Sequence, residues 1–122
     1  MFMKYLLCFM LLIVLSISVT AQHGVRIEKE LIEISFNSTM NMEDLESIQS
    51  KLKQKGIDLD YKKTTFNKNS KLSSISFKVD CNDEFSGSAS QSFLTENSRF
   101  GFRRDYTEEV KTPFKIGSLG EF

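Results

Sequence analysis

The sequence has little of the residue types from which catalytic and metal sites are commonly built. It contains one histidine, His23, and two cysteines, Cys8 and Cys81. A zinc site of the usual ligand types needs more members, and a Ser–His or Cys–His nucleophile pair has only His23 to use, close to a chain terminus. The motifs HExxH, GxxxxGK[ST] and GxGxxG are absent. We therefore expect a protein that is not an enzyme, with no catalytic, cofactor-binding or metal residues and no cofactor.

An excess of charge of one sign is also lacking. The chain has 16 basic and 16 acidic residues, which gives a formal net charge of zero. Nucleic-acid binding depends on the neutralisation of phosphates by an excess of Lys and Arg. We therefore expect no nucleic acid among the partners.

Long hydrophobic runs are lacking except at the N-terminus, where Lys4 precedes an apolar segment from Leu6 to Val19. The sequence Val19-Thr20-Ala21 then offers the small residues that a signal peptidase needs. The run is shorter than the ~20 residues that span a bilayer as a helix. The pattern predicts a signal peptide over residues 1–21, a single small domain over residues 22–122, and export to the periplasm or the extracellular space.

Cleavage after Ala21 removes Cys8 and leaves Cys81 as the one cysteine of the mature chain. A lone cysteine forms no intrachain disulfide, so the fold must depend on its core. Two interpretations of Cys81 remain. It is a small hydrophobic residue at the end of a strand, which we favour, or a reactive or intermolecular thiol.

The first half of the domain predicts a strand followed by a helix. Alternation over Leu31–Phe36 indicates a half-buried strand. Asn41 can cap a helix whose apolar stripe is Leu45, Ile48 and Leu52. Gly56 is suited to the left-handed residue that ends the helix, so that Ile57 folds back onto Leu52. Val25 and Ile27 have the opposite parity to the first strand, which indicates either a bulge or a separate edge segment.

The second half predicts strands joined by short polar loops. Alternation indicates strands over residues 57–66, 72–81, 85–93 and about 99–103. The segment 85–93 alternates weakly through small residues, which is typical of an edge or of close packing against the backbone. The resulting class is α+β: an antiparallel sheet of four to five strands with one helix packed on one face, in β-α-β-β-β order.

Aromatic and arginine side chains are concentrated near the C-terminus and form the candidate docking surface. Interfaces favour these residue types. The alternative places the aromatic residues in the core and the arginines on a solvated face. On either interpretation we expect charge reversal of Arg103 and Arg104 to leave stability nearly unchanged. The candidate residues are Arg99, Phe100, Phe102, Arg103, Arg104, Tyr106 and Phe114.

Several segments carry a family resemblance. The block from Asp44 to Tyr61, with Leu52-Lys53-Gln54-Lys55-Gly56-Ile57 at its centre, is followed by the block from Phe66 to Ser76. These blocks, with Ser86-Gly87-Ser88 and the residues 113–117, resemble the extracytoplasmic segment of antirepressor-type (beta-lactam-sensor-like) membrane metallopeptidases of Gram-negative bacteria. They also resemble small exported proteins of those bacteria without the peptidase domain. The resemblance covers about residues 31–117 and implies an extracytoplasmic domain, with no catalysis because the peptidase motif is absent.

Together these features predict an exported, non-enzymatic domain that acts by protein interaction or ligand sensing in the periplasm or at the cell surface. Its expected partner is an envelope protein. In the alternative, the N-terminal segment is not cleaved, and the protein is a membrane-tethered accessory that modulates a membrane peptidase or sensor. The sequence leaves the partner, the ligand, the strand order and the oligomeric state open.

Overall fold

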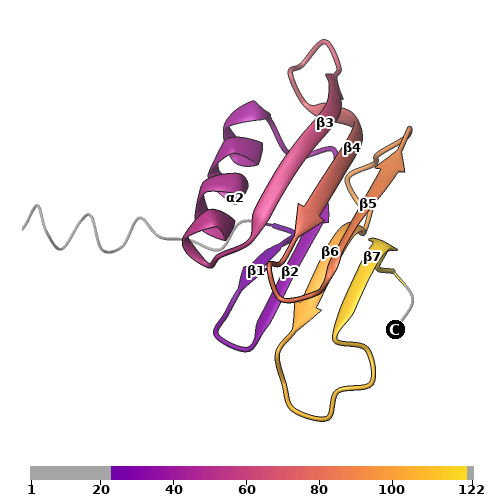
Figure 1. The fold of residues 1–122 in the computed structure, drawn as a ribbon. Coiled ribbons are helices and arrows are strands. Elements are labelled where there is room, and N and C mark those ends of the chain that lie inside the picture. The colour runs from indigo at the N-terminus through magenta and orange to yellow at the C-terminus, as the bar shows by residue number, and fades with distance from the viewer. Residues whose placement is uncertain (1–22, 121–122) are drawn as a thin grey trace, which may run out of the picture.

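The computed structural model describes residues 23–120, and the expected signal peptide therefore lies outside the described residues. The described part contains one helix and seven strands in two antiparallel sheets (Figure 1). The first sheet has the order β1-β2-β6-β7 and the second the order β3-β4-β5. The elements are β1 Val25–Ile27, β2 Leu31–Phe36, α2 Met42–Gln54, β3 Asp58–Phe66, β4 Leu72–Asp80, β5 Ser86–Gln91, β6 Phe100–Asp105 and β7 Phe114–Ser118.

The α+β class, the antiparallel pairing and the place of the helix between β2 and β3 are confirmed. The sequence predicts one sheet of four to five strands, whereas the described strands divide between two sheets. The extra strands are β1, a separate edge strand paired with β2, and β7, which follows Pro113. β1 is the separate edge segment that the sequence left open beside a bulge, whereas β7 was not predicted as a strand. Alternation alone does not indicate which strands share a sheet.

The helix begins and ends as its sequence predicts. The Asn41 side chain accepts a hydrogen bond from the Asp44 N–H at 2.9 Å, and the Asp44 carboxylate accepts one from the Asn41 N–H at 2.9 Å. This capping box satisfies backbone donors that lack intrahelical partners. At the other end Gly56 has φ +82°, and the Ile57 N–H donates to the Leu52 carbonyl at 2.9 Å. This pairing is the Schellman motif, and it buries Ile57 in the core.

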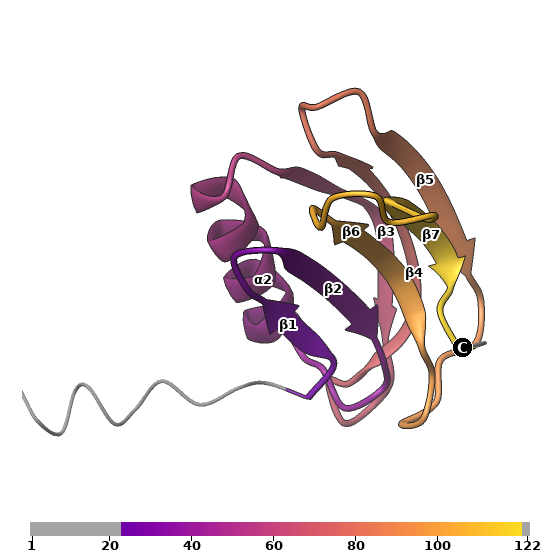
Figure 2. The same ribbon diagram turned by 90° about the horizontal axis from the view of Figure 1, so that it is seen from below.

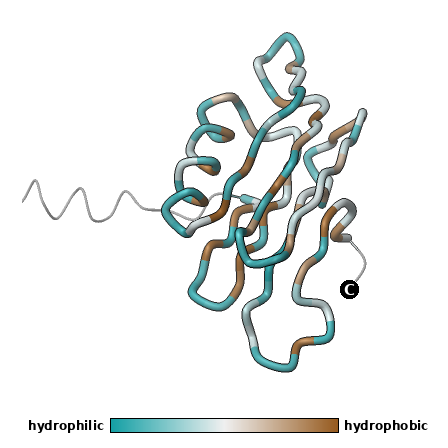
Figure 3. The backbone as a smooth tube through the Cα atoms, in the orientation of Figure 1, coloured by the Kyte–Doolittle hydropathy of each residue, from teal (hydrophilic) through white to brown (hydrophobic). Residues whose placement is uncertain are grey.

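The two sheets pack face to face around Phe77 of β4. Its ring centroid lies 5.2 Å from that of Phe36 on β2, and 5.9 and 6.4 Å from those of Phe100 and Phe102 on β6. The helix lies beside β3 (Figures 1 and 2) and adds its buried stripe to the same core. Figure 3 shows the hydrophilic loop between β3 and β4 at the end of the molecule away from this core. Among residues 23–120, no helix has the length and apolar character needed to cross a membrane.

Gly101 permits an unusually close approach of β6 to β2. A Cβ built at this position lies 1.9 Å from the carbonyl oxygen of Ile34, which is backbone and cannot rotate away. Only glycine is compatible with this register, in which Gly101 pairs with Ser35.

Candidate functional site

Two members of the candidate docking surface belong to the core. Phe100 is 7% exposed and Phe102 is fully buried, and both rings pack against Phe77. Their assignment to a docking surface is therefore wrong, because neither ring can reach a partner without opening the sheet packing. Both residues are core residues because they lie on the inner face of β6, which the second sheet covers.

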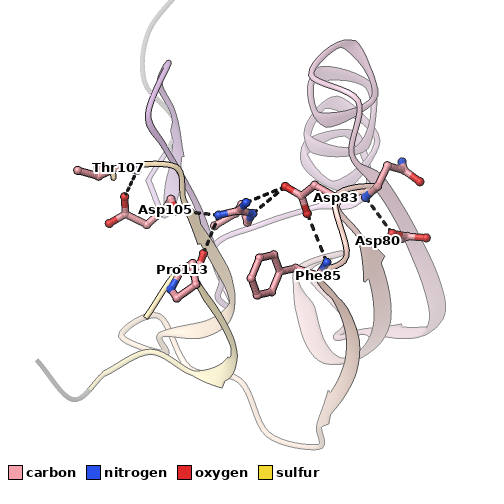
Figure 4. Close-up of polar contacts among 8 residues, drawn as sticks. Asp80, Asp83, Phe85, Asp105, Thr107 and Pro113 are labelled. Atoms are coloured by element: carbon pink, nitrogen blue, oxygen red, sulfur yellow. Dashed lines mark hydrogen bonds and ion pairs between the residues drawn. The ribbon is translucent and has the colours of Figure 1, made fainter. Parts of the chain in front are cut away.

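Arg104 has the same parity along β6 as these two phenylalanines and joins three parts of the chain. In Figure 4 its contacts are the dashed lines that reach Asp83, Asp105 and Pro113. Its guanidinium donates to the Asp83 carboxylate in the β4–β5 turn, at 2.9 Å from Nε and 2.8 Å from Nη2. Nη1 donates to the carbonyls of Asp105, at 2.7 Å, and Pro113, at 3.1 Å. Arg104 thus connects β6 to the neighbouring turn of the second sheet and to the β6–β7 loop.

Two aromatic rings cover this guanidinium. Its central carbon lies 4.6 Å from the ring centroid of Phe85 and 4.4 Å from that of Tyr106. The side chain of Arg104 is only 11% exposed. A buried, fully bonded guanidinium between two rings stabilises the fold and offers nothing to a partner. The expectation that Arg104 lies on a solvated or docking face is therefore wrong.

The remaining four candidate residues do not form one surface. Arg99 is exposed and pairs with Glu33 of β2 at 3.1 Å. Arg103 is half-buried and lies on the outer face of the first sheet, opposite Glu33 in register. Tyr106 is 38% exposed at the end of β6, and Phe114 is half-buried beside Phe85. The structure brings Tyr106 and Phe114 to the region around Arg104, and Arg99 and Arg103 to the opposite face of the sheet.

An open hollow of about 590 Å³ lies on the outside of the β1–β2 hairpin. Its charged rim consists of the ion pairs Arg26–Glu28, at 2.7 Å, and Arg99–Glu33. At its base the Asn37 side chain is engaged within the chain: its oxygen accepts from the N–H of Thr39, and its nitrogen lies 3.4 Å from the Ser35 carbonyl. Because these polar groups already have partners, the hollow presents no uncompensated charge to a ligand. His23 lines it and is exposed.

Cys81 follows β4 directly and is 6% exposed, with no disulfide. Burial, followed by the nearby Asp83 carboxylate, raises the pKa of the Cys81 thiol to about 11. The thiolate is the reactive form of cysteine, so a thiol with this pKa is inert at neutral pH. The described residues therefore favour the interpretation of Cys81 as a small buried hydrophobic residue. Within residues 23–120 no group of three or more His, Cys, Asp and Glu residues is placed to hold a metal ion.

The edges of the sheets differ in how they are protected. An exposed edge strand can pair with another chain, and proteins block this with short strands, charges, proline or bulges. In the first sheet, β1 is three residues long and carries Arg26. At the other edge β7 begins just after Pro113, carries Lys115 and contains Gly117 at φ +106°.

The edge of the second sheet at β3 is also protected. Lys62 and Lys63 lie at an irregularity in the pairing of β3 with β4. The helix runs beside this strand, and the Gln49 side chain donates to the Leu59 carbonyl at 2.7 Å. A charged, irregular strand with a helix beside it is a poor template for further pairing.

The opposite edge, β5, has none of these protections. No charged residue occurs between Glu84 and Glu96, and the strand itself reads Ser-Gly-Ser-Ala-Ser-Gln over Ser86–Gln91. Its side chains are exposed or half-buried, and Figure 3 shows the strand in pale colours of intermediate hydropathy. The described structure thus has one uncharged sheet edge, in a chain in which 26% of the residues are charged.

The backbone groups on this free edge belong to three serines. The Cys81 N–H donates to the Phe85 carbonyl at 2.9 Å, so the odd-numbered residues of this segment turn their backbone groups toward β4. Successive residues of an antiparallel strand direct these groups alternately to the two sides. The N–H and C=O of Ser86, Ser88 and Ser90 therefore point away from the sheet.

Phe93 lies just beyond this edge and is 84% exposed, the most exposed large hydrophobic side chain among the described residues. Its neighbour Leu94 is buried, and the Leu94 N–H donates to the Ser73 carbonyl at 3.0 Å. Because Leu94 is fixed in the core, the preceding side chain is held on the outside. The small residues of 85–93 indicated either an edge or close packing against the backbone, and the segment was not recognised as a site. The signal that could have found it is the absence of charge over the whole segment.

Comparisons with protein-family models, curated proteins and solved structures find no match to this chain. The resemblance to the extracytoplasmic segments of membrane metallopeptidases therefore stays a prediction.

Proposed function

We propose that this protein is an exported, non-enzymatic interaction domain that binds an extended polypeptide segment along the free edge of β5. The observation that carries the proposal is the unprotected edge itself, where Ser86, Ser88 and Ser90 direct unpaired backbone groups outward. Strand addition of this kind derives its affinity from backbone hydrogen bonds. The N-terminal segment predicts export of this domain to the periplasm or the cell surface.

Two features beside the edge support recognition of a particular segment. Phe93 offers an exposed aromatic side chain at the end of β5, and aromatic anchors contribute strongly to interfaces. On the outer face of the sheet, a hollow of about 310 Å³ is lined by Lys63, Ser76 and Ser90, among others. An added strand directs alternate side chains toward this face, where the hollow can receive one of them.

Substitutions at Ser88 test this function. Ser88→Pro removes an N–H that points outward, and proline is tolerated at such an edge position. Ser88→Ala is the matched control, because it removes the hydroxyl and keeps the N–H. We expect the wild type and Ser88→Ala to retain the same cross-linked partners from an envelope extract and Ser88→Pro to lose them. Retention of the same partners at the same yield by Ser88→Pro would falsify the proposal.

A further inference from the structure

We infer that a partner at this edge is a second copy of the same chain, paired through β5 in an antiparallel register centred on Ser88. The inference rests on the proposed function of the β5 edge and names its occupant. In an antiparallel pair, residues directly opposite each other place their side chains on the same face. A two-fold axis at Ser88 satisfies this condition, since it pairs Ser88 with Ser88, Ser86 with Ser90, and Gly87 with Ala89 of the second copy.

This register uses every backbone group that faces outward from β5. The N–H and C=O of Ser86 meet those of Ser90 in the other copy, and the two Ser88 residues exchange hydrogen bonds across the axis. The residues that alternate with them already face β4 in each copy. The β3-β4-β5 sheets of the two copies then form one continuous sheet. The contact is isologous, so it closes as a dimer and does not grow into a fibre.

The side chains on the outer face are compatible with this pairing. The facing residues are all serines, and a serine pair of this type already exists on the same face, where the Ser90 hydroxyl donates to that of Ser76 at 2.8 Å. The nearest cation in the central row is Lys78, which pairs with Ser88 within each copy. The two Lys78 residues are then three strand spacings apart, about 14 Å. That separation exceeds the Debye length of about 8 Å at physiological ionic strength, so their repulsion is screened.

The inner face gains buried apolar area. A Cβ built on Gly87 lies 3.3 Å from Ile116 and 3.7 Å from Phe114, so these half-buried β7 side chains border the free edge. In the dimer, Ala89 of the second copy lies opposite Gly87 and extends the cover over them. The same axis brings Phe93 toward the start of β5 in the second copy, where Phe85 is half-buried. Phe93, the most exposed large hydrophobic side chain among residues 23–120, then lies at the end of the interface between the two copies.

Disulfide trapping tests the register. Ser88→Cys places two thiols directly opposite, with Cα atoms about 5.5 Å apart, which is within the range of a disulfide. Ser90→Cys is the matched control, because the two copies of that position are offset by about four residues, or about 13 Å. In the purified exported protein we expect Ser88→Cys to form a cross-linked dimer at least about tenfold faster than Ser90→Cys. The buried Cys81 is common to both variants and sets the background.

The oligomeric state of the same protein gives the second measurement. We expect the mass from light scattering to rise from monomer to dimer with concentration for the wild type and Ser88→Ala. Ser88→Pro, and Ser88→Lys, which sets two ammonium groups opposite each other, should remain monomeric with unchanged far-ultraviolet circular dichroism. Equal cross-linking of the two cysteine variants, or a monomeric wild type at every concentration, overturns the dimer. If Ser88→Pro nevertheless loses its envelope partners, the edge function stands without self-pairing; if it retains them, both proposals fail.

Discussion

Replacing Arg104 with methionine removes the charged head that joins β6 to the β4–β5 turn while keeping an apolar stem between the rings of Phe85 and Tyr106. The guanidinium contacts the Asp83 carboxylate at 2.8 and 2.9 Å and the carbonyls of Asp105 and Pro113. Its side chain is 11% exposed, whereas that of Asp83 is 30% exposed. The substitution therefore leaves a partly hydrated carboxylate and the Asp105 carbonyl without the arginine donor, whereas the Pro113 carbonyl keeps the N–H of Asp105 at 2.8 Å.

The expected loss of stability follows from these contacts. Breaking a buried ion pair by removing one partner costs about 3–5 kcal/mol, mainly because the other charge stays buried. Asp83 can reach water, which places the cost of breaking the ion pair near or below the lower limit. The Asp105 carbonyl, which loses its donor, adds about 1 kcal/mol where water cannot replace the donor. We expect Arg104→Met to lower the free energy of unfolding by about 3–4 kcal/mol in total. For a domain of this size that corresponds to a fall in Tm of about 12–32 °C.

Urea and thermal denaturation measure this loss, and Arg26→Met is the matched control. Arg26 pairs with Glu28 at 2.7 Å, but both side chains are more than half exposed. An exposed ion pair contributes less than about 1 kcal/mol. If Arg104→Met and Arg26→Met change the free energy of unfolding by the same small amount, Arg104 does not stabilise the connection between β6, the β4–β5 turn and the β6–β7 loop.

Three further predictions concern the core. Leu52→Ala should cost about 2–5 kcal/mol, because Leu52 is fully buried, and Lys53→Ala less than about 0.5 kcal/mol; equal losses in urea denaturation contradict the packing of the helix. Gly101→Ala should cost about 3 kcal/mol or more, since the added Cβ meets backbone, and a wild-type Tm contradicts this. The Cys81 thiol ionises near its ordinary value of 9.0 when unfolded and near 11 when folded. Its contribution to stability is therefore complete below pH 9 and is lost as the pH rises through 11; alkaline denaturation of Cys81→Ser should lack this contribution.

The helix could be predicted almost completely from sequence because its determinants are local. Asn41, the stripe from Leu45 to Leu52, and Gly56 each act within one or two turns, and the structure has the cap, the buried face and the left-handed residue where the sequence places them. Ile57 packs back as its position after Gly56 indicates. Local rules suffice here since no distant segment is needed to decide the outcome.

The division into two sheets could not be predicted in the same way. The strands β2 and β4 both alternate clearly, and alternation states which side chains share a face but not what covers that face. Whether Phe36 and Phe77 belong to one sheet or to two facing sheets depends on contacts between distant segments. The structure has them face to face with ring centroids 5.2 Å apart.

The prediction of the docking surface was wrong because it did not take account of which face of β6 is buried. Phe100, Phe102 and Arg104 have the same parity along β6, so they share a face, and the burial of the two phenylalanines takes Arg104 inward with them. The sequence alone does not show which residue would neutralise a buried arginine. Asp83, which makes that burial acceptable, lies in a distant turn. The small residues of β5 left an edge and close packing as alternatives. The lack of protection at this edge becomes meaningful only beside the protected edges of the other strands.

Backbone amide exchange, resolved residue by residue in the purified exported protein, tests the central claim most directly. At low concentration the N–H groups of Ser86, Ser88 and Ser90 should exchange quickly, while those of Gly87 and Ala89, which face β4, exchange slowly. At high concentration the account predicts that the three serine amides become protected and that the amides facing β4 change little. Serine amides that exchange at the same rate at every concentration, and also in the presence of a partner captured from the envelope, would contradict the account.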